Sequence, residues 1–343
     1  MSSLICGSIA YDTIMSFEGR FQDQILPDQI HILNVAFLVP HMRREFGGCA
    51  GNIAYNLKLL GGDPVIMATV GGDAGPYFDQ LAKYDITADH IRELPDAFTA
   101  QAMITTDRDN NQITAFHPGA MSESHLNTVS DVVKVRKTSV KVGIVAPDGR
   151  QGMTEHAKGL AENKVPFIFD PGQGLPMFNG PELLEFIELA TYVAVNDYEG
   201  EMLSQRTGLS LSDIAKKVEA LIVTKGAQGA EIYTNGKLIQ IPPVKVEKAI
   251  DPTGCGDAFR AGLLYGIENG LDWEVTGRIG SLMGAIKIAS QGPQNHAPSI
   301  NEIQSQYKAA FGSNFKEISP FWVKTHRKTR QVLTLGGFFY ISC

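Results

Sequence analysis

Apolar runs that end in glycine-rich or polar loops recur along most of the 343 residues, and they alternate with segments of helical spacing. This alternation is typical of a parallel sheet that helices cover on both faces. We therefore predict an α/β chain with three α/β/α layers and a predominantly parallel central sheet. Ligands bind such sheets beyond the carboxyl ends of the strands. The expected buried strands are 3–9, 64–70, 142–146, 166–170, 191–195 and 221–225.

Two stretches break this rhythm. Residues 99–106 and 111–117 flank a polar turn, which is the signature of a β-hairpin. The apolar run 31–39 is interpreted as another strand, and together with 13–18 it would join the hairpin in a small separate sheet. Helices are expected at 50–60, 75–83, 255–269, 272–290 and 299–310.

The chain divides into a body and a tail. Residues 1–312 are interpreted as one domain, and the segments of the small sheet, about 12–45 and 98–118, are inserted in it. Residues 313–343 are basic and aromatic without a clear period. Chain ends are often poorly ordered, so we interpret them as an appendage of unknown order.

Composition narrows the class of protein. The net charge of −7 argues against a nucleic-acid partner, which usually requires a basic face. No export signal is visible, and no apolar run approaches the roughly 20 residues that span a bilayer, so no membrane association is expected. The four cysteines show no zinc-like spacing and are interpreted as reduced thiols. These features predict a cytoplasmic location.

The strongest chemical signal is the run from Asp251 to Phe259, DPTGCGDAF, just before an expected helix. Glycines 254 and 256 allow a sharp turn that brings backbone N–H groups close to an anion, and the helix N-terminus adds partial positive charge. Phosphoryl transfer requires such a cradle for developing charge. Asp257, in the first helical turn, could accept the proton of an attacking hydroxyl. Local chemistry equally allows a simple capping role for this residue.

Two common kinase patterns do not occur. The chain contains no G-x-x-x-x-G-K-[ST] run, which argues against a P-loop kinase, and no protein-kinase set of motifs. A second glycine-rich motif, FGGCAGN, covers residues 46–52. Its paired glycines can bring the backbone close to a ligand, and Asn52 can donate to and accept from adjacent hydroxyls. Taken alone, this motif also fits an ordinary turn before a helix.

Together the two motifs resemble the signatures of the ribokinase-like (PfkB) family of carbohydrate and nucleoside kinases, in order and in separation. The resemblance covers about residues 3–312 and implies the ribokinase-like fold with a small β-sheet lid. It also implies that Asp257 is the general base and that Gly254, Cys255 and Gly256 form the anion hole. In this family the substrate aspartate follows the first strand, where Asp12 lies.

The resemblance implies further site residues. Gly48 and Asn52 would complete the sugar site. The sequence NDYE matches the family's N-x-x-E motif, in which Glu199 would orient water around Mg²⁺ and Asn196 would lie near the phosphates of ATP. Without the family, NDYE is typical of a capped helix start. Thr224, Gly226 and Gly229 resemble the segment that lines the nucleotide, and SQGPQNH at 290–296 resembles a loop that closes over adenine. Some members also bind a monovalent cation between this loop and the backbone at the positions of Asp251 and Thr253. The sequence leaves both possibilities open for this chain.

The acceptor substrate is inferred from one departure from the family pattern and from the apolar composition of the expected lid. Ribokinases place Lys after the paired glycines, whereas this chain has Cys49, which argues against free ribose. The expected lid is rich in apolar side chains that could stack on a base, among them Phe116. We therefore expect phosphorylation of the 5′-hydroxyl of adenosine or a related ribonucleoside. The apolar side chains that favour this acceptor are Ile14, Phe17, Phe37, Leu38, Val39, Phe98 and Phe116.

Three alternatives remain at this point. The apolar lid residues could serve only to bury the lid. Arg43, Arg44 and Arg108 would suit a sugar phosphate, although neighbouring residues of a strand point to opposite faces, so at most one of Arg43 and Arg44 faces the site. An inactive nucleotide-binding regulator belongs to a different class, and the intact motifs argue against it. The exposed lid edge further suggests a homodimer.

Overall fold

The computed structural model describes residues 2–25, 31–109, 111–135 and 140–315. Its large sheet consists of β1 (Ser2–Cys6), β4 (Pro64–Gly71), β5 (Ile91–Leu94), β8 (Val140–Val145), β9 (Phe167–Phe169), β10 (Tyr192–Asn196), β11 (Ala220–Thr224), β12 (Ala230–Thr234) and β13 (Lys237–Ile241). Its helices are α1 (Cys49–Leu59), α2 (Gly75–Lys83), α3 (Val129–Val135), α4 (Arg150–Glu162), α5 (Gly180–Leu189), α6 (Asp197–Thr207), α7 (Leu211–Ala215), α8 (Cys255–Glu268), α9 (Trp273–Ile288) and α10 (Ile300–Phe311).

Within the described residues the large sheet has the strand order β13-β12-β11-β10-β9-β8-β1-β4-β5. Neighbouring strands from β11 through β5 are parallel, and only β12 runs antiparallel to its two neighbours. The carboxyl ends of the parallel strands therefore meet at one edge, as the sequence predicted.

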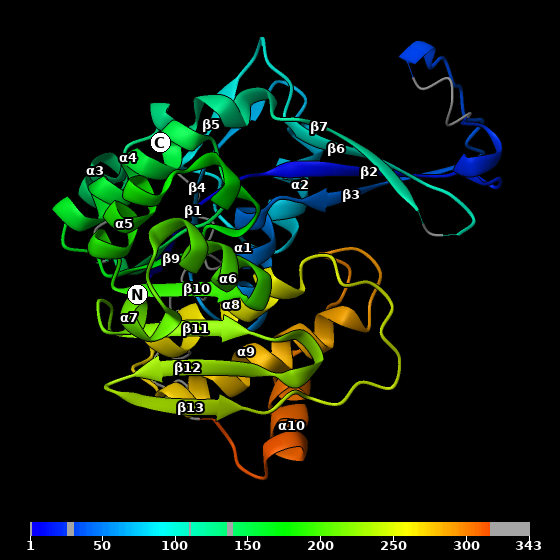
Figure 1. The fold of residues 1–343 in the computed structure, drawn as a ribbon. Coiled ribbons are helices and arrows are strands. Elements are labelled where there is room, and N and C mark those ends of the chain that lie inside the picture. The colour runs from blue at the N-terminus through cyan, green and yellow to red at the C-terminus, as the bar shows by residue number, and fades with distance from the viewer. Residues whose placement is uncertain (1, 26–30, 110, 136–139, 316–343) are drawn as a thin grey trace, which may run out of the picture.

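Alternating side chains of each buried strand build two separate cores. In β1, Leu4 and Cys6 pack on the side of α4, α5 and α6, whereas Ile5 packs on the side of α1, α8 and α9. Both sets are fully buried, because successive residues of a strand point to opposite faces and both faces are covered. Figure 1 shows the resulting layers, which confirm the predicted three-layer fold.

A second sheet, here called the lid, consists of β2 (Ala10–Ser16), β3 (His41–Gly47), β6 (Ala100–Thr106) and β7 (Gln112–His117) in the order β3-β2-β6-β7. It projects away from the large sheet (Figure 1). The inner ends of its strands, Ala10, Gly47 and Ala100, are in register with one another.

The predicted strand over 31–39 is wrong. Apart from a short helical turn at its start, this segment has no regular structure, and the third lid strand is formed by the charged residues that follow it. Ile32 and Leu38 are largely exposed. An apolar run becomes a strand only where a neighbour offers hydrogen-bond partners, and β2 already pairs with β3 and β6.

Sequence reasoning also missed the hairpin β12-β13. Its two-residue turn is Asn235-Gly236, and both residues have positive φ. This dipeptide between alternating apolar residues is a strong hairpin signal.

Beyond α10, Phe315 is buried against Tyr307, with ring centroids 4.9 Å apart. The remainder of the predicted tail lies outside the described residues. Of the helices in the described part of the chain, none is both long and apolar enough to cross a membrane.

Candidate active site

The carboxyl ends of three neighbouring strands bring polar residues together. Asp170 follows β9, Asn196 ends β10, and Thr224 ends β11. Asn196 and Thr224 are direct register partners, so the two predicted nucleotide-binding segments lie side by side. Gly226 and Gly229 follow in a tight turn closed by a 2.8 Å hydrogen bond from Lys225 N–H to the Gly229 carbonyl.

The run from Asp251 to Gly256, here called the anion loop, leads into α8. Gly254 has φ of 80°, and a Cβ there would lie 2.9 Å from the Cβ of Pro293. Only glycine therefore fits this turn without strain. Asp251 Oδ1 accepts a 2.9 Å hydrogen bond from Thr253 N–H and holds the loop in shape. The Cys255 N–H is engaged with the Pro252 carbonyl at 3.1 Å.

Asp257, in the first turn of α8, lies beside the second glycine-rich motif, residues 46–52. Its Oδ2 accepts a 2.8 Å hydrogen bond from Asn52 Nδ2. Burial raises the pKa of Asp257 to about 7, with a further contribution from the Asp170 charge, while the Asn52 hydrogen bond opposes the rise. A carboxylate with such a pKa is suited to accept a proton near neutral pH.

Gln294 connects this pair to the lid, and sequence reasoning did not single it out. Its Nε2 donates to Asn52 Oδ1 at 3.0 Å and lies 2.9 Å from the Tyr77 hydroxyl. That hydroxyl donates to the Gly47 carbonyl at the end of β3. Gln294 is almost fully buried. The loop that contains Gln294 was recognised, but no local pattern shows that this glutamine reaches α1.

Gly48 begins that helix at a point of close backbone contact. Its φ is 84°, and a Cβ there would lie 2.6 Å from the Ser8 carbonyl oxygen. The turn holds α1 against the end of β1, because the Ala50 N–H donates to the same carbonyl at 2.9 Å. Asn52, one turn later, is thereby aimed at Asp257.

Asp12 lies on the inner half of the lid. Register places Glu45, Asp12, Ala102 and Phe116 in one row across its four strands, so their side chains share one face. Burial raises the pKa of Asp12 to about 6, together with the charges of Glu45 and Asp251. Glu45, in the same row, accepts a 2.7 Å hydrogen bond from Asn295 Nδ2, and Gly292 of the same loop donates to Asp251, so this face looks toward the loop that adjoins the anion loop. Phe116 is 53% exposed on the edge strand.

The sequence NDYE forms a complete capping box at the start of α6. Asn196 Oδ1 accepts from Glu199 N–H at 2.7 Å, and Glu199 Oε2 accepts from Asn196 N–H at 2.8 Å. Burial and the neighbouring charge of Asp170 raise the pKa of Glu199. Asn196 and Glu199 therefore do cap this helix, which was the alternative considered from the sequence alone. Capping leaves room for a second role of Glu199.

A buried ion pair was missed by sequence reasoning. Arg260 donates to both carboxylate oxygens of Asp170 at 3.1 Å, and both side chains are almost fully buried. No local signal pointed to this pair, because its two members lie 90 residues apart in the chain. The pair sets the local field, since its charges act on the pKa values of Asp257 and Glu199.

The apolar lid residues do not act as one group. Phe17, Phe21 and Phe37 pack on one another with ring centroids 4.9 to 5.9 Å apart. Phe17 and Phe21 follow β2, and Phe37 precedes β3. Packing within the lid therefore accounts for these apolar side chains. Leu38 and Phe98 are mostly exposed.

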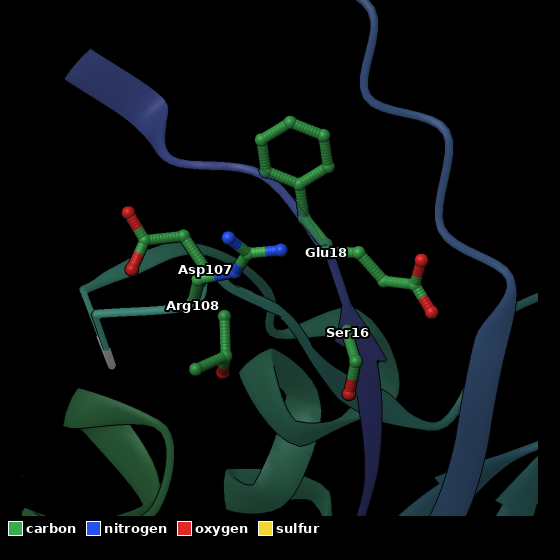
Figure 2. A pocket seen from close by; sticks show the side chains of 6 residues that line it. Ser16, Glu18, Asp107 and Arg108 are labelled. Atoms are coloured by element: carbon green, nitrogen blue, oxygen red, sulfur yellow. The ribbon is translucent and has the colours of Figure 1, made fainter. Parts of the chain in front are cut away.

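An open cavity of about 350 Å³ lies at the outer end of the lid and is lined by Ser16, Phe17, Glu18, Thr106, Asp107 and Arg108. Figure 2 shows the side chains that line it. Asp107 serves the turn there, because it accepts hydrogen bonds from the N–H groups of Phe21, Asp109 and Asn111. Asp12 and Asp257 lie at the other end of the lid strands, so this cavity is separate from the candidate site.

Comparison with known proteins identifies the family. The family of pfkB carbohydrate kinases matches residues 14–300. The structure of Burkholderia thailandensis nucleoside kinase in complex with inosine is 57% identical, with a TM-score of 0.82 over 92% of this chain and 100% of that chain. The same enzyme in complex with ADP-inosine is 58% identical, with a TM-score of 0.80 over 92% and 98%.

A curated nucleoside kinase of Methanocaldococcus jannaschii is 35% identical over 273 residues, which is 79% of this chain and 88% of that protein. These relationships confirm the resemblance seen in the motifs, and with it the ribokinase-like fold and an enzyme that transfers a phosphoryl group to a hydroxyl. The chain belongs to the pfkB family of carbohydrate kinases.

Proposed function

We propose that this enzyme transfers the γ-phosphoryl group of ATP to the 5′-hydroxyl of adenosine or a related ribonucleoside, with Asp257 as general base. The observation that carries the proposal is the pair formed by Asp257 and Asn52 beside the anion loop. In support, burial raises the pKa of the Asp257 carboxylate to about 7, and this carboxylate accepts a hydrogen bond from the residue proposed to hold the sugar.

In the proposed step, Asp257 takes the proton of the 5′-hydroxyl while that oxygen forms a bond to the γ-phosphorus. The bond from the γ-phosphorus to the β,γ-bridging oxygen breaks, and ADP leaves with the electron pair. The amides of Gly254 and Gly256 stabilise the charge on the transferred group. The Cys255 thiol stays neutral, because burial raises its pKa to about 11. Cys255 is therefore not a nucleophile, and its N–H is already engaged by the Pro252 carbonyl.

The acceptor assignment has two supports. The Burkholderia relative was solved in complex with inosine and with ADP-inosine. In this chain, Asp12 and Phe116 share one lid face, so a carboxylate for the ribose hydroxyls and a ring for the base stand in one row.

A sugar-phosphate acceptor is less well supported, because each candidate arginine has another role. Arg43 shares the face of Ile14 but pairs with Glu45 at 3.2 Å. Arg44 lies 4.9 Å from the centre of the Tyr11 ring, and Arg108 lines the outer cavity. An inactive regulator is disfavoured because Asp257, Asn52 and the anion loop keep a geometry that serves transfer.

Magnesium is the expected companion of ATP. In the described ranges no group of three or more His, Cys, Asp or Glu side chains could hold a metal by itself. Mg²⁺ is commonly held by phosphates, waters and one or two carboxylates, and the partly buried Glu199 beside Asp170 fits that demand. Bound there, the ion would neutralise phosphate charge.

Two further features complete the proposal. The outer strand β7 is exposed along its whole length, and the apolar side chain of Ile113 stands out from it, which supports a homodimer through the lid. Light scattering of the purified chain would test that assembly. A cytoplasmic location, with a role in purine salvage, agrees with an ATP-dependent nucleoside kinase, and fractionation would test the location.

The decisive experiment measures kcat/KM by ADP release with Mg-ATP and a panel of acceptors. Adenosine, inosine and cytidine should far exceed ribose, fructose and fructose 6-phosphate, because the base adds binding energy that aligns the 5′-hydroxyl. A free sugar or sugar phosphate as best acceptor would overturn the nucleoside assignment but leave the kinase. No turnover with any acceptor would favour the regulator.

A further inference from the structure

Lys287, in the last turn of α9, is completely buried next to the anion loop. Its ammonium donates to the Asp251 carbonyl at 2.7 Å and to the Ser290 carbonyl at 3.1 Å. A buried ammonium is costly unless it is paired and hydrogen-bonded, so its retention at this point calls for a reason. None of the site assignments above uses it.

The two carbonyls belong to different loops. Asp251 opens the anion loop, and Ser290 opens the run 290–296, here called the closing loop, which contains Gln294. Asp251 also accepts from the Gly292 N–H at 2.9 Å through Oδ2. The ammonium of Lys287 therefore supplies the positive member of a clasp that joins the two loops.

The surroundings of Lys287 favour a cation. Burial lowers the pKa of Lys287, but the carboxylates of Asp251 and Glu45 act to keep its ammonium protonated. The nearby His296 stays neutral and adds no second positive charge, because burial and the Lys287 charge lower the pKa of His296 to about 4. Main-chain carbonyls that converge in this way are the ligands that also replace the water shell of a potassium ion.

We infer that Lys287 is a positioning residue for phosphoryl transfer: its ammonium fills the cation position between the anion loop and the closing loop, so that catalysis needs no free monovalent cation. The inference rests on the proposed function. The ammonium fixes the Asp251 main chain and, through it, the turn that presents the amides of Gly254 and Gly256. No further monovalent cation should bind between these two loops. Both carbonyls already accept from Lys287, and a second positive charge beside the ammonium would be strongly repelled.

The first test uses the unmodified enzyme. Turnover of Mg-ATP with inosine is measured in a buffer whose only monovalent cation is tetramethylammonium, which is too large to replace potassium, and again with added KCl. We expect kcat and the KM for ATP to change by less than about twofold. A strong dependence on potassium would overturn the inference.

The second test removes the ammonium and supplies a replacement. Lys287→Ala leaves space and two unpaired carbonyls, so kcat should fall by about tenfold or more, and K⁺ or ethylammonium should restore it. Lys287→Met lacks the charge but fills the space, so it should lose activity without rescue. Lys141→Ala is the matched control, since Lys141 donates to the Glu268 carbonyl at 2.9 Å near the amino end of β8. This variant should show neither effect.

Thermal unfolding supplies a readout that does not require turnover. A cation that binds only the folded state raises Tm, so KCl should raise the Tm of Lys287→Ala above the effect seen with tetramethylammonium chloride, and should not do so for the wild type. Equal losses in both Lys287 variants, with no rescue and no potassium-dependent Tm, would reduce Lys287 to a packing role and overturn the inference. If neither variant folds, the wild-type assay still decides. A protein without turnover that nevertheless shows the Tm pattern would refute the proposed function alone.

Discussion

The side chain of Asn52, on α1, donates a 2.8 Å hydrogen bond to the carboxylate of Asp257, on α8. The amide oxygen of the same Asn52 accepts from Gln294. One residue thus orients the proposed base and ties it to the closing loop. A sugar hydroxyl that displaced or shared this amide would be brought within reach of Asp257.

The first prediction concerns Asp257 itself. Asp257→Asn should keep the fold and nucleotide binding, because its amide oxygen can still accept from Asn52, but kcat should fall by roughly 100-fold or more. Single-turnover kinetics together with ADP binding by calorimetry would check this. A variant within a few-fold of wild type would leave Asp257 as a structural partner of Asn52 rather than a base.

The same substitution has a consequence for stability. The folded-state pKa of Asp257, about 7, lies above the ordinary value for an aspartate. The folded protein therefore holds a proton that the unfolded chain has already released, and this residue's contribution destabilises the fold as pH rises from about 4 to about 7. Asp257→Asn should raise Tm more at pH 8 than at pH 5, as measured by scanning calorimetry.

The second prediction is a pH profile. If ionised Asp257 is the base, kcat/KM should decline below an apparent pKa near 7, the value for the free enzyme. Because the Asn52 hydrogen bond lowers the pKa of Asp257, Asn52→Ala should shift this acidic limb to higher pH. Gln151→Ala, at an exposed position of α4, serves as the control. If the acidic limb of the kcat/KM profile did not move in Asn52→Ala, the apparent pKa would belong to a group other than Asp257.

Much of the fold was predictable, because strands buried on both faces give continuous apolar runs. Strands β4 and β8 follow that rule, and both were predicted. The rule fails where burial is one-sided or absent. The charged sequence HMRREFG forms β3 because β2 offers it hydrogen bonds, whereas the apolar 31–39 has no such partner.

The site was only partly predictable for a similar reason. Asp257 and Asn52 lie in glycine-rich motifs, so local sequence could single them out, and their 2.8 Å contact supports the choice. Gln294, Arg260 and Lys287 lie in ordinary helical or loop sequence. Their roles arise from contacts between segments far apart in the chain, such as Arg260 with Asp170, and no local pattern records those.

The third prediction separates two roles of Glu199. Glu199→Gln retains a side-chain oxygen that can accept from the Asn196 N–H, so the capping box and the fold should persist. The lost charge should raise the Mg²⁺ concentration needed for half-maximal activity, by about tenfold on the scale of outer-shell substitutions. Nucleoside binding, measured without metal, should not change. An unaltered Mg²⁺ titration would assign NDYE to helix capping alone.

The fourth prediction concerns the C-terminal tail. Deletion of residues 316–343 should leave most activity, because every proposed site residue precedes Phe315 and that ring already packs on Tyr307. Deletion from Phe315 onward removes a buried aromatic ring and should lower Tm further. Loss of activity in the shorter deletion would show that the tail packs on the body.

The last prediction tests how the lid recognises ribose. Asp12 presents two carboxylate oxygens, which suit the neighbouring 2′- and 3′-hydroxyls, so 2′-deoxyadenosine should be a much poorer substrate than adenosine. Asp12→Asn keeps only one acceptor oxygen. It should lower kcat/KM for adenosine strongly and for deoxyadenosine weakly, so that the preference for adenosine shrinks. The comparison of two enzymes with two substrates isolates the interaction between Asp12 and the 2′-hydroxyl, because effects on fold or on ATP binding cancel. Glu18→Gln is the control: Glu18 lies at the outer end of the same lid and lines the distant cavity, so the preference should persist in that variant. An undiminished preference in Asp12→Asn would show that another residue reads the 2′-hydroxyl.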